Sequence, residues 1–161
     1  MRANRFFRFR HDTRGAAAVE VGLAFPFIVM FASGLFEFGS LFYNFELIQT
    51  GVRDAARYLA RVPNPSAAET AARNLATRGT VDATGTLRVK GWQSADITIT
   101  YETTPNPVDP ESGQRSYRGG DPLRVVRVST EFNHSGLGLL KNLWLTPTKV
   151  IAAHEERYVG E

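Results

Sequence analysis

The 161-residue sequence contains no cysteine and only three histidines. Without cysteine the chain has no disulfide, no cysteine-ligated zinc or iron–sulfur site and no thiol nucleophile. The histidines (His11, His134 and His154) are too far apart in sequence to form a metal cluster by local spacing. No P-loop, nucleophile elbow or dinucleotide-binding fingerprint is present either. We therefore expect no enzymatic activity, no cofactor, no metal site and no small-molecule substrate.

An excess of positive charge is found only in the first fourteen residues. This segment has five arginines and one acidic residue, Asp12, so its net charge is +4. The rest of the chain has a net charge of −1, which gives +3 overall. The arginines are Arg2, Arg5, Arg8, Arg10 and Arg14. A basic arm without a recognition motif gives no reason to expect a nucleic-acid partner. The arm is instead typical of a signal that sets membrane topology.

One long apolar stretch follows this arm. Between residues 16 and 45 only Glu20 and Glu37 are charged. As a helix this stretch has a length of roughly 45 Å, which exceeds the ~30 Å hydrocarbon core of a bilayer. It predicts a transmembrane helix over 16–45, with residues 21–42 in the bilayer and the two glutamates towards opposite interfaces. The positive-inside rule places residues 1–15 in the cytoplasm and the C-terminal part outside it.

A cleaved secretory signal has the same general features. Here the apolar stretch is long, and Glu20 stands at its start. The best approach to an Ala-x-Ala cleavage site, Ala32-Ser33-Gly34, lies inside the apolar section instead of after it. These mismatches favour a retained anchor over a removed signal.

Helical periodicity continues beyond the predicted membrane span. Apolar residues recur at helical spacing, which predicts an amphipathic stalk over 46–62; they are Phe45, Ile48, Val52, Ala55, Ala56 and Leu59. Pro63-Asn64-Pro65 ends this helix. Ser66 with Glu69 forms the pattern of a capping box, which predicts a short helix that stops before Gly79.

From there the pattern changes to the alternation of strands. Strands are predicted over 96–102, 123–132 and 149–158, with an earlier one at Leu87 and Val89. Prolines and glycines predict a long, exposed, flexible loop over 103–122. A short amphipathic helix is predicted from Leu137 to Trp144, and Phe132 and Trp144 are expected in the core.

These elements predict an α+β protein. A long N-terminal transmembrane helix continues as the amphipathic stalk and leads to a small exported domain, residues 66–161, with an antiparallel sheet and short helices packed on one face.

Two features of the membrane entry have specific uses. Gly15 has no Cβ, so a protease can approach and extend the backbone, and cleavage after it leaves a charged amine on Ala16. Glu20 is costly in hydrocarbon unless a cation, such as an amine of a neighbouring helix, neutralises it. A carboxylate at this position therefore favours a staggered assembly of similar helices.

These residues resemble a type IV prepilin processing site. The wider stretch resembles the TadE-like family of pseudopilins, or minor pilins, of the Tad (Flp-type) pilus system. The resemblance is carried by four segments in order: Arg14-Gly15-Ala16-Ala17-Ala18-Val19-Glu20, Leu23-Ala24-Phe25-Pro26, Gly34-Leu35-Phe36-Glu37-Phe38-Gly39 and Ala55-Ala56-Arg57.

The resemblance implies cleavage between Gly15 and Ala16 by a prepilin peptidase on the cytoplasmic side of a bacterial inner membrane. It implies assembly through Glu20, with other pilins or pseudopilins, the Tad assembly platform and membrane lipid as partners. Pro26 either kinks the anchor or loosens it for repacking into a filament, and Glu37 is either an interfacial residue or a subunit contact. Major Flp pilins have tyrosine after the glutamate and are shorter, whereas Val21 follows here, which favours an E-like or F-like accessory subunit.

Two other classes of protein are alternatives. The first is an uncleaved single-pass scaffold or sensor subunit with an extracytoplasmic binding domain. The second is a membrane-tethered hydrolase, which ranks last because the exported region contains two histidines and no catalytic motif.

Overall fold

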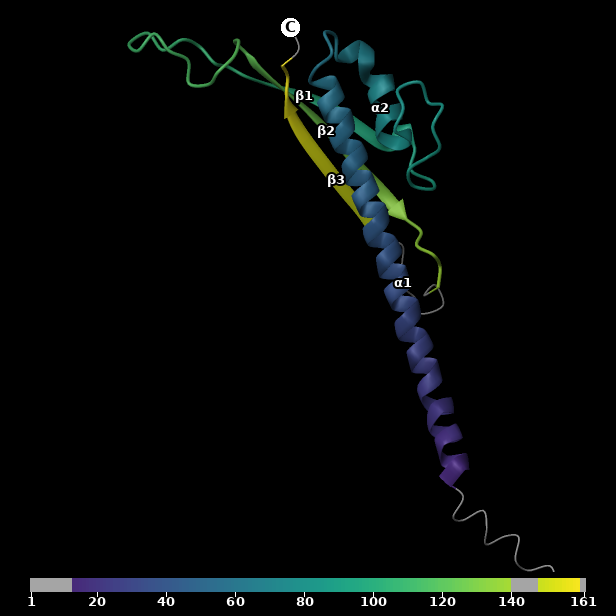
Figure 1. Ribbon diagram of the computed structural model, residues 1–161. Coiled ribbons are helices and arrows are strands. Elements are labelled where there is room, and N and C mark those ends of the chain that lie inside the picture. Colours follow the sequence, from purple (N-terminus) through teal and green to yellow (C-terminus); the bar gives the residue numbers. More distant parts are fainter. Residues whose placement is uncertain (1–12, 140–147, 160–161) are drawn as a thin grey trace, which may run out of the picture.

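The longest element is a continuous N-terminal helix. In the computed structural model, which describes residues 13–139 and 148–159, helix α1 comprises Thr13–Leu59 (Figure 1). Its 47 residues have a length of roughly 70 Å. The first half extends away from the rest of the chain, and the second half packs against a sheet and a shorter helix. One helix therefore belongs both to the apolar N-terminal part and to the folded domain, as the sequence predicted.

The sheet has three antiparallel strands in the order β1-β2-β3. They are β1 (Ile97–Thr104), β2 (Leu123–His134) and β3 (Thr148–Arg157). In the register of the sheet, Val128 is paired with Ile99 on one side and with His154 on the other. The three predicted strands at these positions are confirmed, with ends that differ by a few residues.

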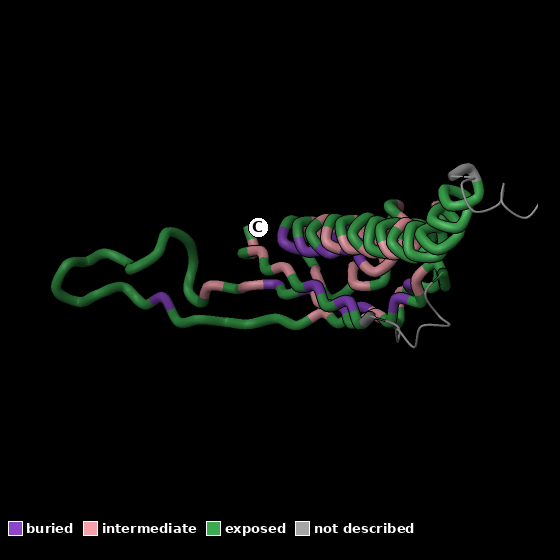
Figure 2. The backbone as a smooth tube through the Cα atoms, turned by 90° about the horizontal axis from the view of Figure 1, so that it is seen from below, coloured by how far each residue is buried: buried purple, intermediate pink, exposed green. Residues whose placement is uncertain are grey.

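The core lies between one face of the sheet and the two helices. Alternation along the strands turns the apolar side chains of one face towards α1, and the layers are seen end-on in Figure 2. The predicted apolar side of the stalk fills this space, and Ala72 and Ala76 of the second helix complete it. The buried hydrophobic residues that α1 and the sheet contribute to this core are Ile48, Val52, Ala55, Ala56, Leu59, Ile97, Val126, Val128, Val150 and Ala152. The α+β architecture with helices on one face is confirmed.

The second helix begins differently from the prediction. A 3-10 turn, η1 (Ser66–Ala68), precedes α2 (Glu69–Arg78). Pro65 already has helical dihedral angles, so Ser66 lies inside the turn and its side chain makes no cap hydrogen bond. Instead, Oδ1 of Asn64 accepts a hydrogen bond from the backbone N–H of Ala67 at 3.3 Å. The predicted capping box is therefore wrong, whereas the helix end before Gly79 is confirmed by the positive φ of 78° at that residue.

The strand predicted at Leu87 and Val89 is also wrong. Residues 79–93 form turns, followed by a short 3-10 helix, η2 (Ser94–Asp96). The backbone N–H of Arg88 donates to the carbonyl of Thr77 at the end of α2, and its guanidinium binds Asp54 of α1 at 2.8 Å. Arg88 is thus bound to two helices instead of pairing in a strand, and the apolar residues of the segment, Val89 and Trp92, are buried in the core.

The connection between β1 and β2 projects from the domain as an arm, residues 105–122 (Figures 1 and 2). Thr103 and Thr104, predicted as loop, belong to β1. Most arm residues are exposed, but Asn106 is 1% exposed. Its side chain donates to the carbonyls of Tyr117 (2.8 Å) and Gly120 (3.3 Å) and accepts the Tyr117 N–H at 3.1 Å. One buried amide thus joins the two sides of the arm.

Two predictions concern the chain before β3. The helix predicted from Leu137 to Trp144 and the core position of Trp144 fall mainly on residues 140–147, outside the described residues. Leu137 and Leu139 lie in a turn in which Gly136 and Gly138 have positive φ angles. Phe132 packs against the core and is partly buried, as expected.

Candidate functional site

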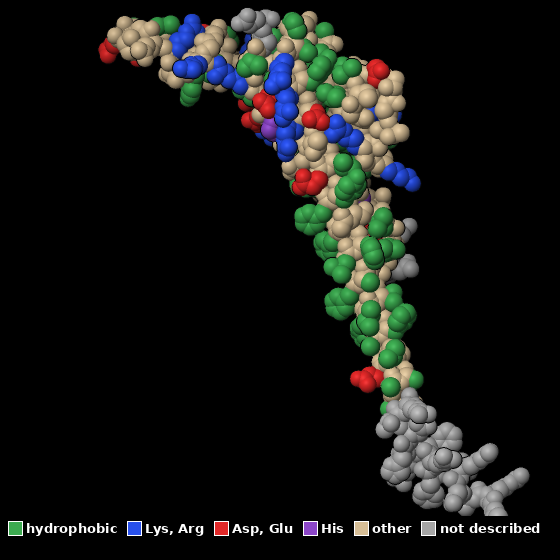
Figure 3. All heavy atoms as spheres, in the orientation of Figure 1, with side chains coloured by type: hydrophobic (Ala, Val, Ile, Leu, Met, Phe, Trp, Pro, Cys, Tyr) green, Lys and Arg blue, Asp and Glu red, His purple; other side chains and the backbone are tan. Residues whose placement is uncertain are grey.

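The first half of α1 is an apolar surface that the described residues leave largely uncovered. Every residue from 15 to 31 is exposed. Figure 3 shows hydrophobic side chains along this half of the helix, whereas the charged side chains lie mainly on the folded domain. The exposed large apolar residues of this half are Val19, Val21, Leu23, Phe25, Phe27, Ile28, Val29, Met30, Phe31, Leu35 and Phe36. A surface of this size requires lipid or other protein around it. The helix is long and apolar enough to cross a membrane, which fits a single-pass membrane protein.

The predicted processing residues lie at the beginning of this helix. Gly15 and Ala16 are the third and fourth residues of α1 and are exposed. A Cβ atom at Gly15 would have no other atom within 4 Å, so space around this position is open. The predicted topology residues Arg2, Arg5, Arg8 and Arg10 lie outside the described residues, and Arg14 is in the first turn of the helix.

Glu20 lies one turn beyond Ala16 and is exposed among apolar side chains. None of the salt bridges between described residues involves it. A carboxylate in this position is stabilised when a cation lies near it, and burial in lipid or protein without one is costly. Among the described residues, Glu20 is therefore an exposed carboxylate without an ion-pair partner.

Pro26 lies within α1, and the helix continues through it. Because proline has no backbone N–H, the helix lacks one of its hydrogen bonds at this point. Pro26 is exposed together with the residues around it. It is thus a position of local weakness within the apolar surface.

Glu37 has a partner that the sequence did not indicate. Its carboxylate accepts the backbone N–H groups of Leu137 (2.9 Å) and Leu139 (3.3 Å), which lie directly before the undescribed residues that lead to β3. Gly136 has a φ of +65°, and a Cβ atom there would overlap the Glu37 carboxylate. The glycines of Ser135-Gly136-Leu137-Gly138 indicate a turn in the sequence, but no local pattern indicates that the turn reaches residue 37.

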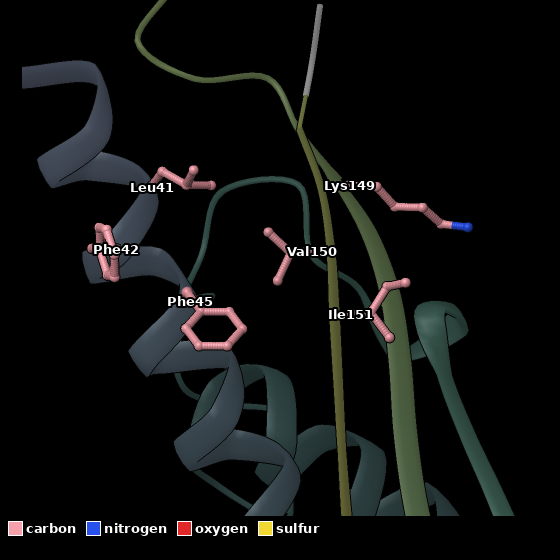
Figure 4. Close-up of a pocket in the computed structure, with 6 residues that line it drawn as sticks. All are labelled: Leu41, Phe42, Phe45, Lys149, Val150 and Ile151. Atoms are coloured by element: carbon pink, nitrogen blue, oxygen red, sulfur yellow. The ribbon is translucent and has the colours of Figure 1, made fainter. Parts of the chain in front are cut away.

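Next to this contact, the helix and β3 enclose an open apolar groove of about 400 Å³. Leu41, Phe42 and Phe45 line it from α1, and residues 149–151 line it from β3. Figure 4 shows Val150 pointing towards Phe45, with Lys149 and Ile151 on the other side of the strand. The groove thus lies where the exposed half of α1 meets the folded domain.

Titratable groups with shifted pKa values lie elsewhere. Burial, and then the hydrogen bond to Glu69, raises the pKa of Tyr101 to about 12. Hydrogen bonds from Ser112 and Glu111 lower the pKa of Asp109 in the arm. The part of the chain that the structure describes contains no group of three or more His, Asp or Glu side chains placed to hold a metal ion.

Comparison with known families gives a match to this helix. Residues 15–57 match the family model described as TadE-like protein. The match begins at Gly15 and ends two residues before the end of α1, so the predicted resemblance is confirmed over this stretch. Neither the curated proteins nor the solved structures contain a significant match to the chain.

Proposed function

We propose that this chain, whose long helix carries the TadE-like sequence, is a non-enzymatic minor pilin or pseudopilin of a Tad (Flp-type) pilus. One observation carries the proposal. The family match coincides with a helix whose first half exposes a continuous apolar surface and one carboxylate, Glu20. Such a helix is suited to pack first among lipids and then among other helices of the same kind.

Processing is the first step of the proposed mechanism. A prepilin peptidase cuts between Gly15 and Ala16 and removes the arginine-rich leader on the cytoplasmic side of the inner membrane. Both residues belong to the first turn of α1, where a helix has the fewest internal hydrogen bonds and unwinds most easily into a protease active site. The product has a new positive charge at Ala16 and has Glu20 as its fifth residue.

Assembly is the second step. Such helices stack in parallel, displaced along their axes. Glu20 of one subunit then forms an ion pair with the α-ammonium group of a neighbouring pilin or pseudopilin. Removal of both charges from water is tolerated because each neutralises the other. The assembly platform then moves the subunit out of the bilayer, and the folded domain caps or decorates the filament.

The N-terminus of the protein from its native host tests this function. We expect Edman degradation or mass spectrometry of the membrane and sheared-surface fractions to give Ala16 as the first residue. A Gly15→Leu variant should retain its leader and disappear from the sheared fraction, whereas Gly22→Leu, in open space on the same helix, should be processed normally. An unprocessed Met1 start confined to the membrane would favour the uncleaved scaffold or sensor subunit instead.

A further inference from the structure

The turn at residues 136–139 is fixed to the membrane helix. Both carboxylate oxygens of Glu37 accept backbone N–H groups of this turn, from Leu137 and Leu139. The absence of a side chain at Gly136 is what allows the carboxylate to approach so closely. The turn therefore lies at the same height along the axis of α1 as residue 37.

That level corresponds to the outer edge of the hydrocarbon core. Glu37 lies seventeen residues after Glu20, or roughly 25 Å along a helix. With Glu20 at the cytoplasmic boundary, a hydrocarbon thickness of ~30 Å ends near residue 40. The turn thus reaches the outer leaflet, provided that α1 spans the bilayer as proposed above.

The side chains of the turn suit this depth. Leu137 is 56% exposed and Leu139 is 51% exposed, although both lie close to the helix. Phe38 and Phe42 of α1 and Ile151 of β3 are exposed too, and Phe42 and Ile151 line the apolar groove. These residues extend the apolar surface of the helix onto one edge of the folded domain.

Two backbone N–H groups of the turn also have the hydrogen-bond partner that burial in hydrocarbon requires. An N–H group without a hydrogen-bond partner is strongly unfavourable in hydrocarbon. The N–H groups of Leu137 and Leu139 have the Glu37 carboxylate as their acceptor, and the same bonds stabilise a carboxylate near the membrane boundary. The Glu37 carboxylate and these two N–H groups of the turn therefore satisfy each other.

We infer that the turn at residues 136–139, together with the apolar groove, is a second membrane contact, in which Leu137 and Leu139 insert among the phospholipid acyl chains of the outer leaflet. Glu37 positions this contact. The folded domain then lies against the bilayer in one orientation instead of moving freely on the end of α1.

The absence of cysteine allows a direct test. Single variants Leu137→Cys and Leu139→Cys of the full chain are labelled with the fluorophore NBD and reconstituted in phosphatidylcholine–phosphatidylglycerol vesicles. We expect doxyl-labelled lipids to quench both probes several-fold more than a probe at Tyr117→Cys in the arm, which is 58% exposed in the structure. A probe at Val29→Cys reports whether α1 itself is in the bilayer.

The outcomes separate the two proposals. If the Val29 probe is quenched and the probes at 137 and 139 behave like the one at 117, the second contact is wrong and the membrane span stands. If the Val29 probe is not quenched, the span fails and this inference fails with it.

Glu37 provides the second variant. Glu37→Ala should lower the quenching of the Leu139→Cys probe to the level of the arm, with the Val29 probe and the melting temperature of the domain unchanged. Glu37→Gln retains an acceptor oxygen and should lower the quenching of this probe less than Glu37→Ala does. If neither substitution of Glu37 changes the quenching of the Leu139→Cys probe, the carboxylate does not position the turn.

Discussion

Gly51 of α1 lies directly against Trp92, so closely that a Cβ atom at position 51 would be 2.8 Å from Cη2 of the indole. The same Cβ would overlap the carbonyl oxygen of Ala76 in α2. Gly51 thus allows α1, α2 and the segment that contains Trp92 to meet at one point. The folded domain depends on this approach because α1 supplies much of its core.

Gly51→Ala should destabilise the domain. Alanine favours a helix over glycine by about 1 kcal/mol, but the added methyl group has to displace backbone and a fully buried indole. We expect a net loss of about 1–3 kcal/mol, measured by thermal unfolding of the detergent-solubilised protein. Gly39→Ala is the matched control, since a Cβ atom there has no neighbour within 4 Å. Equal melting temperatures for the two variants would contradict the close approach.

The hydroxyl of Thr130 supports the same tryptophan. Trp92 Nε1–H donates to Thr130 Oγ1 at 3.0 Å, and this hydroxyl donates to the Asp96 carbonyl at 2.8 Å. Thr130→Val keeps the volume but leaves the buried indole N–H without an acceptor, so we expect a loss of about 1–3 kcal/mol in the free energy of unfolding.

A denaturant titration measures this loss. Thr100→Val, at an exposed position of β1, should change stability by no more than about 0.5 kcal/mol. A Thr130→Val protein as stable as this control would show that the hydrogen bond contributes little.

Tyr101 should give the domain a dependence on alkaline pH. Its pKa is raised to about 12, first by burial and then by Glu69, whereas an unfolded tyrosine titrates near 10. Below pH 10 both states hold the proton and the stabilising effect is complete; between pH 10 and about 12 the unfolded state loses its proton first and stability falls.

Ultraviolet absorbance of tyrosinate, with Tyr101→Phe subtracted, measures this pKa. Glu69→Gln should lower the value towards 10, and Glu102→Gln, an exposed neighbour in β1, should leave it unchanged. If Glu69→Gln does not change the pKa of Tyr101, the hydrogen bond to Glu69 is not a cause of the raised pKa.

Asn106 should determine the order of the arm without affecting the core. Asn106→Ala removes the three side-chain hydrogen bonds that join the two sides of the arm. We expect faster amide exchange of the Tyr117 N–H and of its neighbours, with an unchanged melting temperature. Ser112→Ala, at the exposed end of the arm, is the control. Slow exchange at Tyr117 in the Asn106→Ala protein would mean that other contacts order the arm.

Local patterns in the sequence predicted the long helix, its amphipathic second half and three strands. These features depend on periodicity, which each segment carries by itself. The buried position of Trp92 and the turns around Arg88 were not predictable in this way, because their partners belong to other elements. Trp92 donates to Thr130 of β2, and Arg88 binds Asp54 of α1 and Thr77 of α2. The short β-like pattern at Leu87 and Val89 was overridden by these tertiary contacts.

The same reason applies to the candidate site. Gly15, Glu20 and Pro26 lie in one helix, so their order in the sequence is sufficient to group them, and their roles stay predictions. The partners of Glu37 follow it by about a hundred residues, and a turn with two glycines is compatible with many positions. Only the three-dimensional structure places the turn beside the helix.

Glu20 provides the sharpest test of assembly. Glu20→Gln keeps the shape and removes the charge, so we expect normal cleavage after Gly15 but a smaller amount of the chain in the sheared pilus fraction. A loss of one charge pair worth about 1.4 kcal/mol corresponds to about a tenfold decrease in incorporation. Glu46→Gln, exposed on the same helix outside the predicted bilayer section, should be incorporated like the wild type. Quantitative immunoblotting of membrane and sheared fractions gives the ratio for each variant. Normal incorporation of Glu20→Gln would show that packing of the apolar surface alone is sufficient, because in that case no subunit amine depends on the carboxylate.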